Sequence, residues 1–187
     1  MNESVIRLRV VEYIGSGEAW GRDQGRQVYR LLEDEIFKAE KAIVGSKVVI
    51  FDLSGITKMD ASFPQEAIVE ISRRFRGSKY FVMTNIDNEG IEENISMAFE
   101  KRKEAGVVRD VRGLRIIGAQ LPPGFEEIIK FAEGRDFITS KEVKDVLGGS
   151  IQNASNKLKS IWELGLLQRF EGNAKSGGRE NVYRKVG

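Results

Sequence analysis

The stretch ITSKEVKDVLGGSIQNASNKLKSIWELGLLQRFEGNAKSGGRENVYRKV, residues 138–186, decides the fold of the second half of the chain. It predicts a helix over 139–147, in which a Thr-Ser pair supplies the N-cap and Glu142 stands close behind it. A second helix is predicted to begin after its cap, Ser150, and to run to about Leu164. The stretch therefore predicts two consecutive helices, each with its own cap.

Further elements are predicted before and after these two helices. Gly165 stands in the C′ position, where it would end the second helix. Two strand-like pieces, 166–170 and 181–186, follow, and they are joined by the Gly- and Lys-rich turn 171–180. A short helix is predicted upstream, over 125–132. Three helices and a two-stranded ribbon in about 63 residues make up the winged-helix layout, an α+β arrangement.

Residues 125–186 resemble the winged helix-turn-helix domains of bacterial and archaeal transcription regulators, on the pattern quoted above. In that family the second helix of the motif is the recognition helix, and a basic ribbon called the wing contacts phosphate. Carried over by position, the recognition helix is 150–164 and the wing is about 172–181. The resemblance implies that the partner is duplex DNA.

The helix predicted over 150–164 has one apolar and one polar face. Ala154, Leu158 and Ile161 fall on one side, where they would face a core. Glutamine and asparagine can make bidentate hydrogen bonds to an adenine edge in the major groove, each good pair contributing ~1–3 kcal/mol of discrimination. The candidate base contacts at the start of the helix and on its polar face are Ser150, Gln152, Asn153, Asn156, Lys159 and Ser160.

Basic residues near the C-terminus are candidates for phosphate contacts. Residues 150–187 carry seven basic and three acidic side chains, whereas residues 1–121 carry 19 of each. Lys157, Lys175 and Arg179 could neutralise phosphates, which adds affinity without sequence preference. A homodimer that presents two such surfaces would add further positive charge. The alternative is that the polar face is only solvated and that this half of the chain binds protein.

The first half alternates strand and helix patterns. The order β-α-β-α-β-α-β predicts an α/β sandwich with a mixed, at least partly parallel sheet. The run at 47–53 is continuously apolar, as expected of a strand covered on both faces. The expected elements are a strand over 5–14, a helix over 22–43, a strand over 47–53, a helix from Pro64 to about Phe75, a strand over 79–84, a helix over 89–104 and a strand over 113–118.

A domain boundary is predicted at GAQLPPG, residues 118–124. A proline pair flanked by glycines stops any regular element there. We therefore expect a first domain over 1–118, a linker over 119–124 and a second domain over 125–187.

The stretch VVIFDLSGITKMDASFPQEAIVEISRRF, residues 48–75, resembles STAS domains and, more closely, the STAS-like family of unassigned function. The upstream helix start GRDQGRQVYRLL, residues 21–32, matches the STAS-like group as well, so the resemblance covers about 5–118. It implies a module that senses a ligand or docks a regulatory protein. In STAS domains a partner kinase phosphorylates a hydroxyl residue directly after the loop aspartate, but here Ala61 follows Asp60. The resemblance therefore does not extend to the phosphorylation switch.

Several polar residues of the first half are candidates for a ligand or partner site. Asp52 and Asp60 flank the loop after a central strand, where α/β folds place ligands. Ser62 stands one place beyond the usual phosphoacceptor position, and Asp60 or Ser62 could equally cap the following helix. A row of arginines near a helix N-terminus could hold an anion or could pair with acidic residues of the same helix. These arginines are Arg22, Arg26 and Arg30.

The composition of this 187-residue chain excludes several enzyme chemistries. It has no Cys and no His, so it can form no disulfide, thiolate nucleophile, Ser-His-Asp triad or imidazole metal site. Oxygen ligands could hold Mg²⁺ or Ca²⁺, but no pattern directs one. Trp20 stands where a dinucleotide fingerprint starting at Gly15 needs glycine, so no cofactor is expected. The longest apolar runs are far shorter than the ~20 residues of a membrane span, and residues 1–11 lack a signal-peptide core, so we expect a cytoplasmic protein without a membrane partner.

These observations lead to one main hypothesis and two alternatives. The main hypothesis is a non-enzymatic regulator whose first domain senses a ligand or docks a partner and whose second domain reads duplex DNA as part of a homodimer. A ligand of the first domain would then change dimer geometry and the spacing of two recognition helices. The alternatives are an adaptor that binds proteins through both domains, and an enzyme that uses Asp52 or Asp60.

Overall fold

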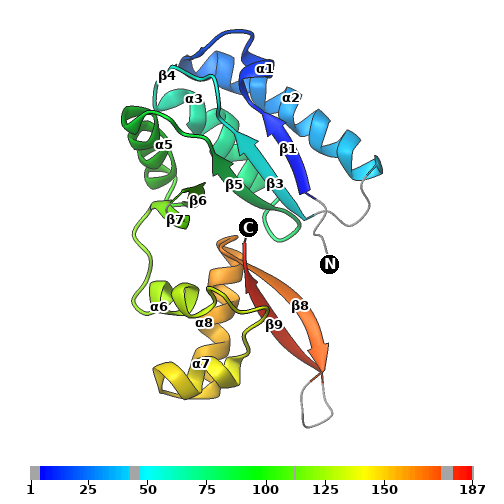
Figure 1. Ribbon diagram of the computed structural model, residues 1–187, viewed down its shortest axis with the longest axis vertical. Helices are drawn as coiled ribbons and strands as arrows, with labels where there is room; N and C mark the ends of the chain where they lie inside the picture. Colours follow the sequence, from blue (N-terminus) through cyan, green and yellow to red (C-terminus); the bar gives the residue numbers. More distant parts are fainter. Residues whose placement is uncertain (1–4, 43–46, 112, 174–178, 187) are drawn as a thin grey trace. The chain divides into compact units, whose positions relative to one another are not determined.

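The computed structural model describes residues 5–42, 47–111, 113–173 and 179–186, and it has a mixed α/β fold (Figure 1). Contacts within the chain divide it into two compact units: unit 1 extends to Gln120, and unit 2 extends from Leu121 to Val186. The division falls inside the Gly- and Pro-rich segment 118–124. In the described part of the chain, no helix combines the length and the apolar composition that crossing a membrane requires.

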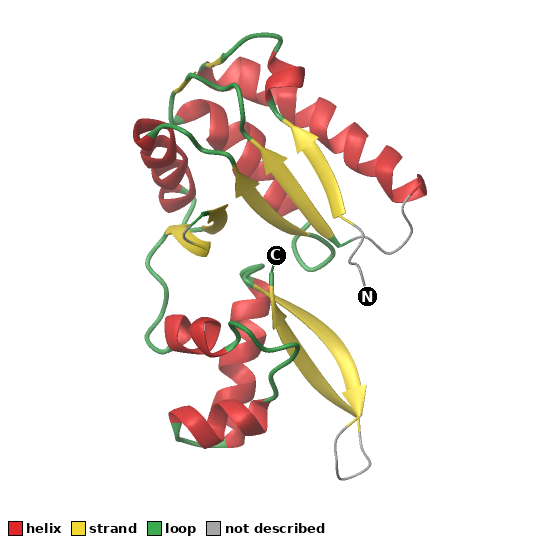
Figure 2. Cartoon of the chain, in the orientation of Figure 1, coloured by secondary structure: helices red, strands yellow, loops and turns green. Residues whose placement is uncertain are grey.

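A five-stranded mixed sheet forms the centre of unit 1, with the strand order β1-β3-β5-β6-β7 (Figure 2). The first four strands pair in parallel, and β7 closes the sheet antiparallel to β6. The expectation of a partly parallel α/β sheet is therefore confirmed. The strands are β1 (Val5–Arg9), β3 (Val48–Asp52), β5 (Tyr80–Thr84), β6 (Ala105–Asp110) and β7 (Gly113–Gly118).

The first predicted strand is too long. The alternation over 5–14 predicts one strand, but β1 ends at Arg9 and the chain turns into the short helix α1 (Val11–Ile14). Val10 continues the pairing of β1 with β3 for one more residue, because its N–H donates to the backbone oxygen of Asp52 at 2.9 Å. The residues after Val10 also pack against the core, so their apolar pattern resembles that of a strand.

Three strands do not appear in the sequence prediction. The predicted helix over 89–104 ends at Lys101, and β6 begins four residues later with only the short apolar run Gly-Val-Val at its centre. A strand with so short an apolar run is stabilised by its neighbours on both sides rather than by its own pattern. The other two strands form a small parallel pair outside the main sheet: β2 (Glu18–Ala19) and β4 (Lys58–Met59).

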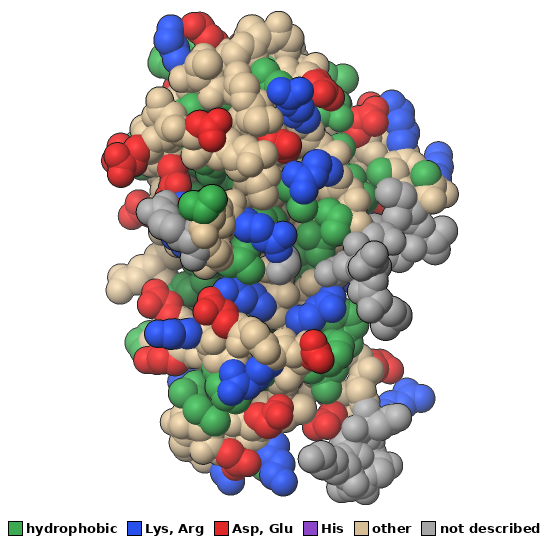
Figure 3. Space-filling model, in the orientation of Figure 1, with side chains coloured by type: hydrophobic (Ala, Val, Ile, Leu, Met, Phe, Trp, Pro, Cys, Tyr) green, Lys and Arg blue, Asp and Glu red, His purple; other side chains and the backbone are tan. Residues whose placement is uncertain are grey.

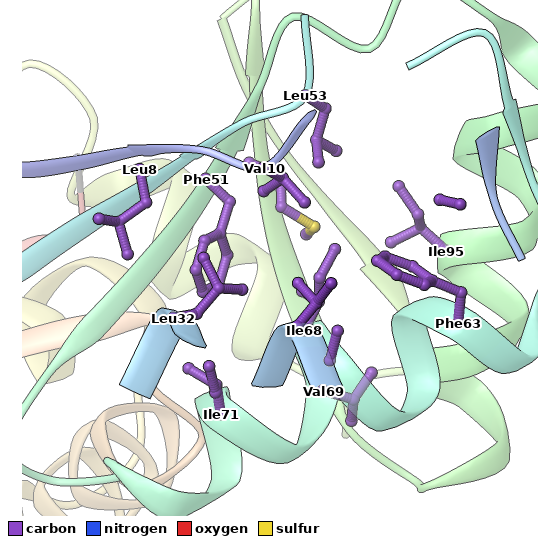
Figure 4. Close-up of a cluster of buried hydrophobic side chains, with 14 of the residues drawn as sticks. Leu8, Val10, Leu32, Phe51, Leu53, Phe63, Ile68, Val69, Ile71 and Ile95 are labelled. Atoms are coloured by element: carbon purple, nitrogen blue, oxygen red, sulfur yellow. The ribbon is translucent and has the colours of Figure 1, made fainter. Parts of the chain in front are cut away.

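The helices of unit 1 bury their apolar residues in the same core as one face of the sheet. Figure 4 shows Leu8 and Phe51 from the strands pointing towards Leu32 and towards Ile68 and Ile71 of the helical segment that begins at Ser62. Residue 43, the last of the predicted helix over 22–43, lies outside the described residues. Besides α1, the helical elements of unit 1 are α2 (Gly21–Ala42), α3 (Ser62–Pro64), the π-helical turn η1 (Gln65–Val69), α4 (Glu70–Arg74) and α5 (Glu89–Lys101).

The helix α2 crosses the segment α3–η1 at a very short distance. A Cβ atom at Gly25 would lie 2.8 Å from the backbone oxygen of Phe63 and 3.0 Å from Cβ of Glu66. Glycine is therefore required at the crossing, because any side chain would push the two helices apart. The helix predicted from Pro64 to Phe75 begins at Ser62 and contains the π-helical turn in its middle.

Unit 2 consists of three helices and an antiparallel ribbon. The helix α8 packs on both α6 and α7, and it also contacts the first strand of the ribbon. Ile138, ahead of α7, exchanges both backbone hydrogen bonds with Tyr183 of the ribbon, at 2.7 and 2.9 Å. The elements are α6 (Phe125–Phe131), α7 (Ser140–Leu147), α8 (Ile151–Glu163), β8 (Leu167–Asn173) and β9 (Arg179–Lys185).

Side-chain caps fix where the helices of unit 2 begin. Thr139 is the N-cap of α7: its hydroxyl accepts from the N–H of Glu142, whose carboxylate in turn accepts from the N–H of Thr139. The hydroxyl of Ser150 accepts from the N–H of Asn153 at the start of α8. Gly165, with a φ of 78°, follows the end of α8 as predicted.

Replacing Thr139 with alanine is expected to lower the free energy of unfolding of unit 2 by about 1 kcal/mol, because the hydroxyl that accepts from the N–H of Glu142 is lost. The matched control is Ser140→Ala, one residue on, since Ser140 is the first residue inside the helix rather than its cap. Urea unfolding followed by far-UV circular dichroism measures both. Equal losses in the two variants would contradict the capping assignment.

Candidate functional site

The polar face of α8 is exposed and rich in amide side chains. Gln152, Asn153 and Asn156 are all solvent-exposed, whereas Ala154, Leu158 and Ile161 are buried. The side-chain amide of Gln152 donates to Oδ1 of Asn156 at 3.0 Å, across one helical turn. This bond leaves the oxygen of Gln152 as an acceptor and the NH₂ of Asn156 as a donor, side by side on the exposed face.

The other residues predicted on this helix have different surroundings. Lys159 is exposed and forms an i,i+4 ion pair with Glu163 at 3.7 Å, and Ser160 is half-buried. Lys157 lies on the flank of the buried face rather than among the amides, since a Cβ atom at Gly124 would lie 2.6 Å from its ammonium nitrogen. The structure thus groups Gln152, Asn153, Asn156 and Lys159 and leaves Lys157 beside the start of α6.

The ribbon is held against α8 at its base. The guanidinium of Arg169 on β8 stacks over the ring of Trp162 on α8, 3.5 Å from the ring centroid. Burial raises the pKa of Tyr183 on β9, although Arg169 beside it acts in the opposite direction. Arg179 begins β9 and is exposed, and within the described residues it has no ion pair. Lys175 and the rest of 174–178, the middle of the predicted wing turn, lie outside the described residues.

An apolar patch beside the amide face was not predicted from the sequence. Val146, Leu147 and Ile151 lie at the end of α7 and the start of α8, and their side chains are 57%, 43% and 54% exposed. The run Val-Leu-Gly-Gly at 146–149 could have predicted this patch. Apolar residues at the end of a helix as short as α7, next to a glycine turn, cannot all be buried. Charged side chains of both signs are interspersed on the face drawn in Figure 3.

Asp60 links the starts of two helical segments of unit 1. Its Oδ1 accepts from the N–H of Gly21 at 3.1 Å and from the N–H of Phe63 at 2.9 Å, and its Oδ2 accepts from the hydroxyl of Ser62 at 2.7 Å. Burial raises the pKa of Asp60, but these hydrogen bonds outweigh burial and hold the pKa below its ordinary value. The contacts of Asp60 match the capping alternative, whereas the hydroxyl of Ser62 donates to Asp60.

Asp52, at the end of β3, has a separate set of partners. Its Oδ1 accepts from the side-chain amide of Asn85 at 2.8 Å and from the N–H of Ser54 at 3.0 Å, and Arg7 lies 3.7 Å from Oδ2. Burial raises the pKa of Asp52, but these neighbours lower it further than burial raises it. Among the described residues, Asp52 and Asp60 share no hydrogen-bond partner.

The predicted arginine row of α2 is joined to the helical segment that crosses it. Arg22 and Arg26 pair with Glu66 of η1, at 4.0 and 3.3 Å, and Arg26 also pairs with Asp23 of its own helix at 3.6 Å. Arg30 forms no ion pair with any described residue. Sequence reasoning missed Glu66 because it is 40 residues from Arg26 and only the crossing of the helices brings them together.

Metal-ligating side chains do not gather in the described ranges: no group of three or more Asp or Glu residues there could hold an ion. Comparison of the chain with protein-family models and with curated proteins finds no match.

Proposed function

We propose that this protein is a non-enzymatic, DNA-binding transcription regulator. In this proposal unit 2 is a winged-helix domain with α8 as its recognition helix and the β8–β9 ribbon as its wing. Unit 1 is a STAS-like module that senses a ligand or docks a regulatory protein. The observation that carries the proposal is the exposed amide face of α8, which two neighbouring helices and the ribbon support from behind.

The arrangement of the amides suits a base edge in the major groove. An adenine offers one donor and one acceptor there, and the free oxygen of Gln152 and the free NH₂ of Asn156 are their complements. The hydrogen bond between Gln152 and Asn156 also orients both side chains in advance, which lowers the entropy lost on binding.

Removing Arg179 is expected to weaken binding to every duplex by a similar factor. If Arg179 contacts one phosphate, Arg179→Ala lowers the slope of log K against log salt concentration by about 0.9, because one fewer counterion is released. Fluorescence anisotropy of random and AT-rich duplexes over a salt series measures the slope. The control Lys130→Ala removes an exposed positive charge from α6 and should leave the slope unchanged. Equal slopes for all three proteins would contradict the placement of the wing.

Asn156→Ala is expected to change which sequences are preferred rather than the salt slope. Loss of one bidentate contact removes about 1–3 kcal/mol of discrimination at a single base pair. Binding to a set of duplexes that differ at one position measures the preference. If Asn156→Ala and Arg179→Ala have the same effect on every duplex, α8 is not the recognition helix.

The exposed apolar patch of Val146, Leu147 and Ile151 favours a second candidate, a protein adaptor, since exposed apolar clusters often mark protein interfaces. Binding to duplex DNA at low salt distinguishes the regulator from the adaptor. A DNA-binding protein shifts a random duplex at low salt, whereas an adaptor does not. As a homodimer, the regulator would present two copies of α8 at a spacing that a ligand or partner of unit 1 could change.

A further inference from the structure

An arginine-lined cavity lies between α2 and the segment η1–α4 of unit 1. Its volume is about 670 Å³, within the range of small-molecule sites. Five of its lining residues are arginines, two are glutamates and one is Tyr29, so the lining has a net charge of +3. The arginines are Arg26, Arg30, Arg73, Arg74 and Arg76.

The glutamates beside the cavity do not use up the arginine donors. Glu66 holds Arg26 at 3.3 Å, and Glu70 holds Arg73 at 3.2 Å. Arg26 also pairs with Asp23 and Arg73 also pairs with Glu104, but a guanidinium has five N–H donors, so each arginine keeps further donors for a ligand. Arg30 has no ion pair with any described residue, although it lines the same cavity. Arg74 pairs with Glu33 at 3.5 Å, but its side chain is 63% exposed and remains accessible.

The arginines of the cavity are exposed at the surface, but the backbone segments that carry them are held in place by the fold. The crossing at Gly25 fixes the distance between α2 and η1. The π-helical turn η1 carries Glu66, and such turns occur frequently at functional sites. Carboxylates on both walls pre-orient the arginines: Glu66 on one side and Glu104, which contacts Arg73 and Arg76, on the other.

We propose that this cavity binds a small organic phosphate carrying at least two phosphoryl groups; the inference rests on the sensing role proposed for unit 1. Planar arginine forks match phosphate oxygens in bidentate geometry. Asp23, Glu33 and Glu104, which lie outside the lining, also pair with its arginines, so the guanidinium donors rather than the net charge indicate the ligand class. A monocarboxylate can engage few of these donors, whereas a ligand with two phosphoryl groups can engage several arginines at once. The ring of Tyr29 forms an apolar part of the wall, where the organic portion would lie.

Isothermal titration of the full chain tests the proposal, with pyrophosphate and ADP as probes and with sodium chloride at matched ionic strength as the blank. We expect one site per chain and tighter binding of ADP than of pyrophosphate. Arg30→Ala should weaken the binding of both probes by about ten-fold or more, because a charge-assisted hydrogen bond without a competing internal partner is lost. Lys41→Ala, which removes an exposed charge from the same helix outside the cavity, should change it less than about two-fold.

Three results would overturn the proposal: no binding beyond the chloride blank, equal binding by wild type and Arg30→Ala, or ADP binding no tighter than pyrophosphate. A loss of duplex affinity in Arg30→Ala without any pyrophosphate binding would show that these arginines contact nucleic acid instead, which also overturns it. The two proposals can fail independently. Arg179→Ala, which should weaken binding to DNA, should bind pyrophosphate and ADP as tightly as wild type does. Pyrophosphate binding by a chain that shifts no duplex would refute the DNA proposal and support the cavity.

Discussion

Gly118→Ala is expected to lower the free energy of unfolding of unit 1 by about 3 kcal/mol, the largest effect of any substitution considered. A Cβ atom at Gly118 would lie 2.5 Å from Cβ of Phe99 and 2.7 Å from the backbone oxygen of Glu104. Gly118 also has a φ of +91°, which disfavours every residue with a side chain. The strand end cannot relax away, because the N–H of Gly118 donates to the hydroxyl of Ser96 at 3.1 Å and the N–H of Ala119 to Glu104 at 2.8 Å.

The matched control for this substitution is Gly113→Ala at the other end of β7. Gly113 has a φ of +110°, but a Cβ atom there would meet nothing within 4 Å. It therefore reports the backbone strain alone, expected at about 1 kcal/mol. Urea unfolding of both variants measures the difference. Equal losses would contradict the packing of β7 against α5 as described.

Asp60→Ala is expected to lower the free energy of unfolding by about 2–3 kcal/mol at pH 7, because two backbone N–H groups lose their acceptor. These donors belong to Gly21 and Phe63, which begin two crossing helical segments, so the substitution also loosens the approach at Gly25. Asp60→Asn is the matched variant. Its side-chain oxygen can still accept from both groups, but it lacks the negative charge favoured near helix N-termini.

The same carboxylate predicts a pH dependence of stability. The folded pKa of Asp60 lies below its unfolded value of about 3.9, so its ionised form stabilises the fold at pH values above that. This contribution is lost as the pH falls from about 4 through the folded pKa. Asp60→Asn should therefore lose stability less steeply than wild type on acidification, as urea unfolding at several pH values would measure. Parallel acid profiles would show that Asp60 is not held ionised by these hydrogen bonds.

The elements that could be predicted from the sequence are those whose pattern is local. The long helix α2 has an apolar stripe over several turns, and β3 is a continuous apolar run, so both were placed within one or two residues. The last two helices of unit 2 were predictable because caps at Thr139 and Ser150 and the glycine at 165 mark their ends. The ribbon strands were predicted too short: β8 extends to Asn173 and β9 begins at Arg179, both inside the turn expected over 171–180.

What could not be predicted depends on contacts between distant residues. The strand β6 forms because β5 and β7 lie on either side of it, and nothing in its three-residue apolar centre requires a strand. The ion pairs of Arg22 and Arg26 were expected within α2, but Glu66 on the crossing segment supplies their shared partner. Lys157 was predicted as a phosphate contact, and nothing in the sequence indicated that its ammonium group would lie beside Gly124 at the start of α6.

The most direct test of the account is the position of α8 relative to DNA. The chain has no cysteine, so a single substitution creates a unique thiol. Asn156→Cys can be mixed at low salt with AT-rich duplexes that carry a disulfide-linked tether on a major-groove base edge, and Lys130→Cys on α6 serves as the matched exposed control. The account predicts a disulfide crosslink from position 156 and none from position 130. Crosslinking from position 130 alone, or from neither position under conditions where the duplex is bound, would contradict it.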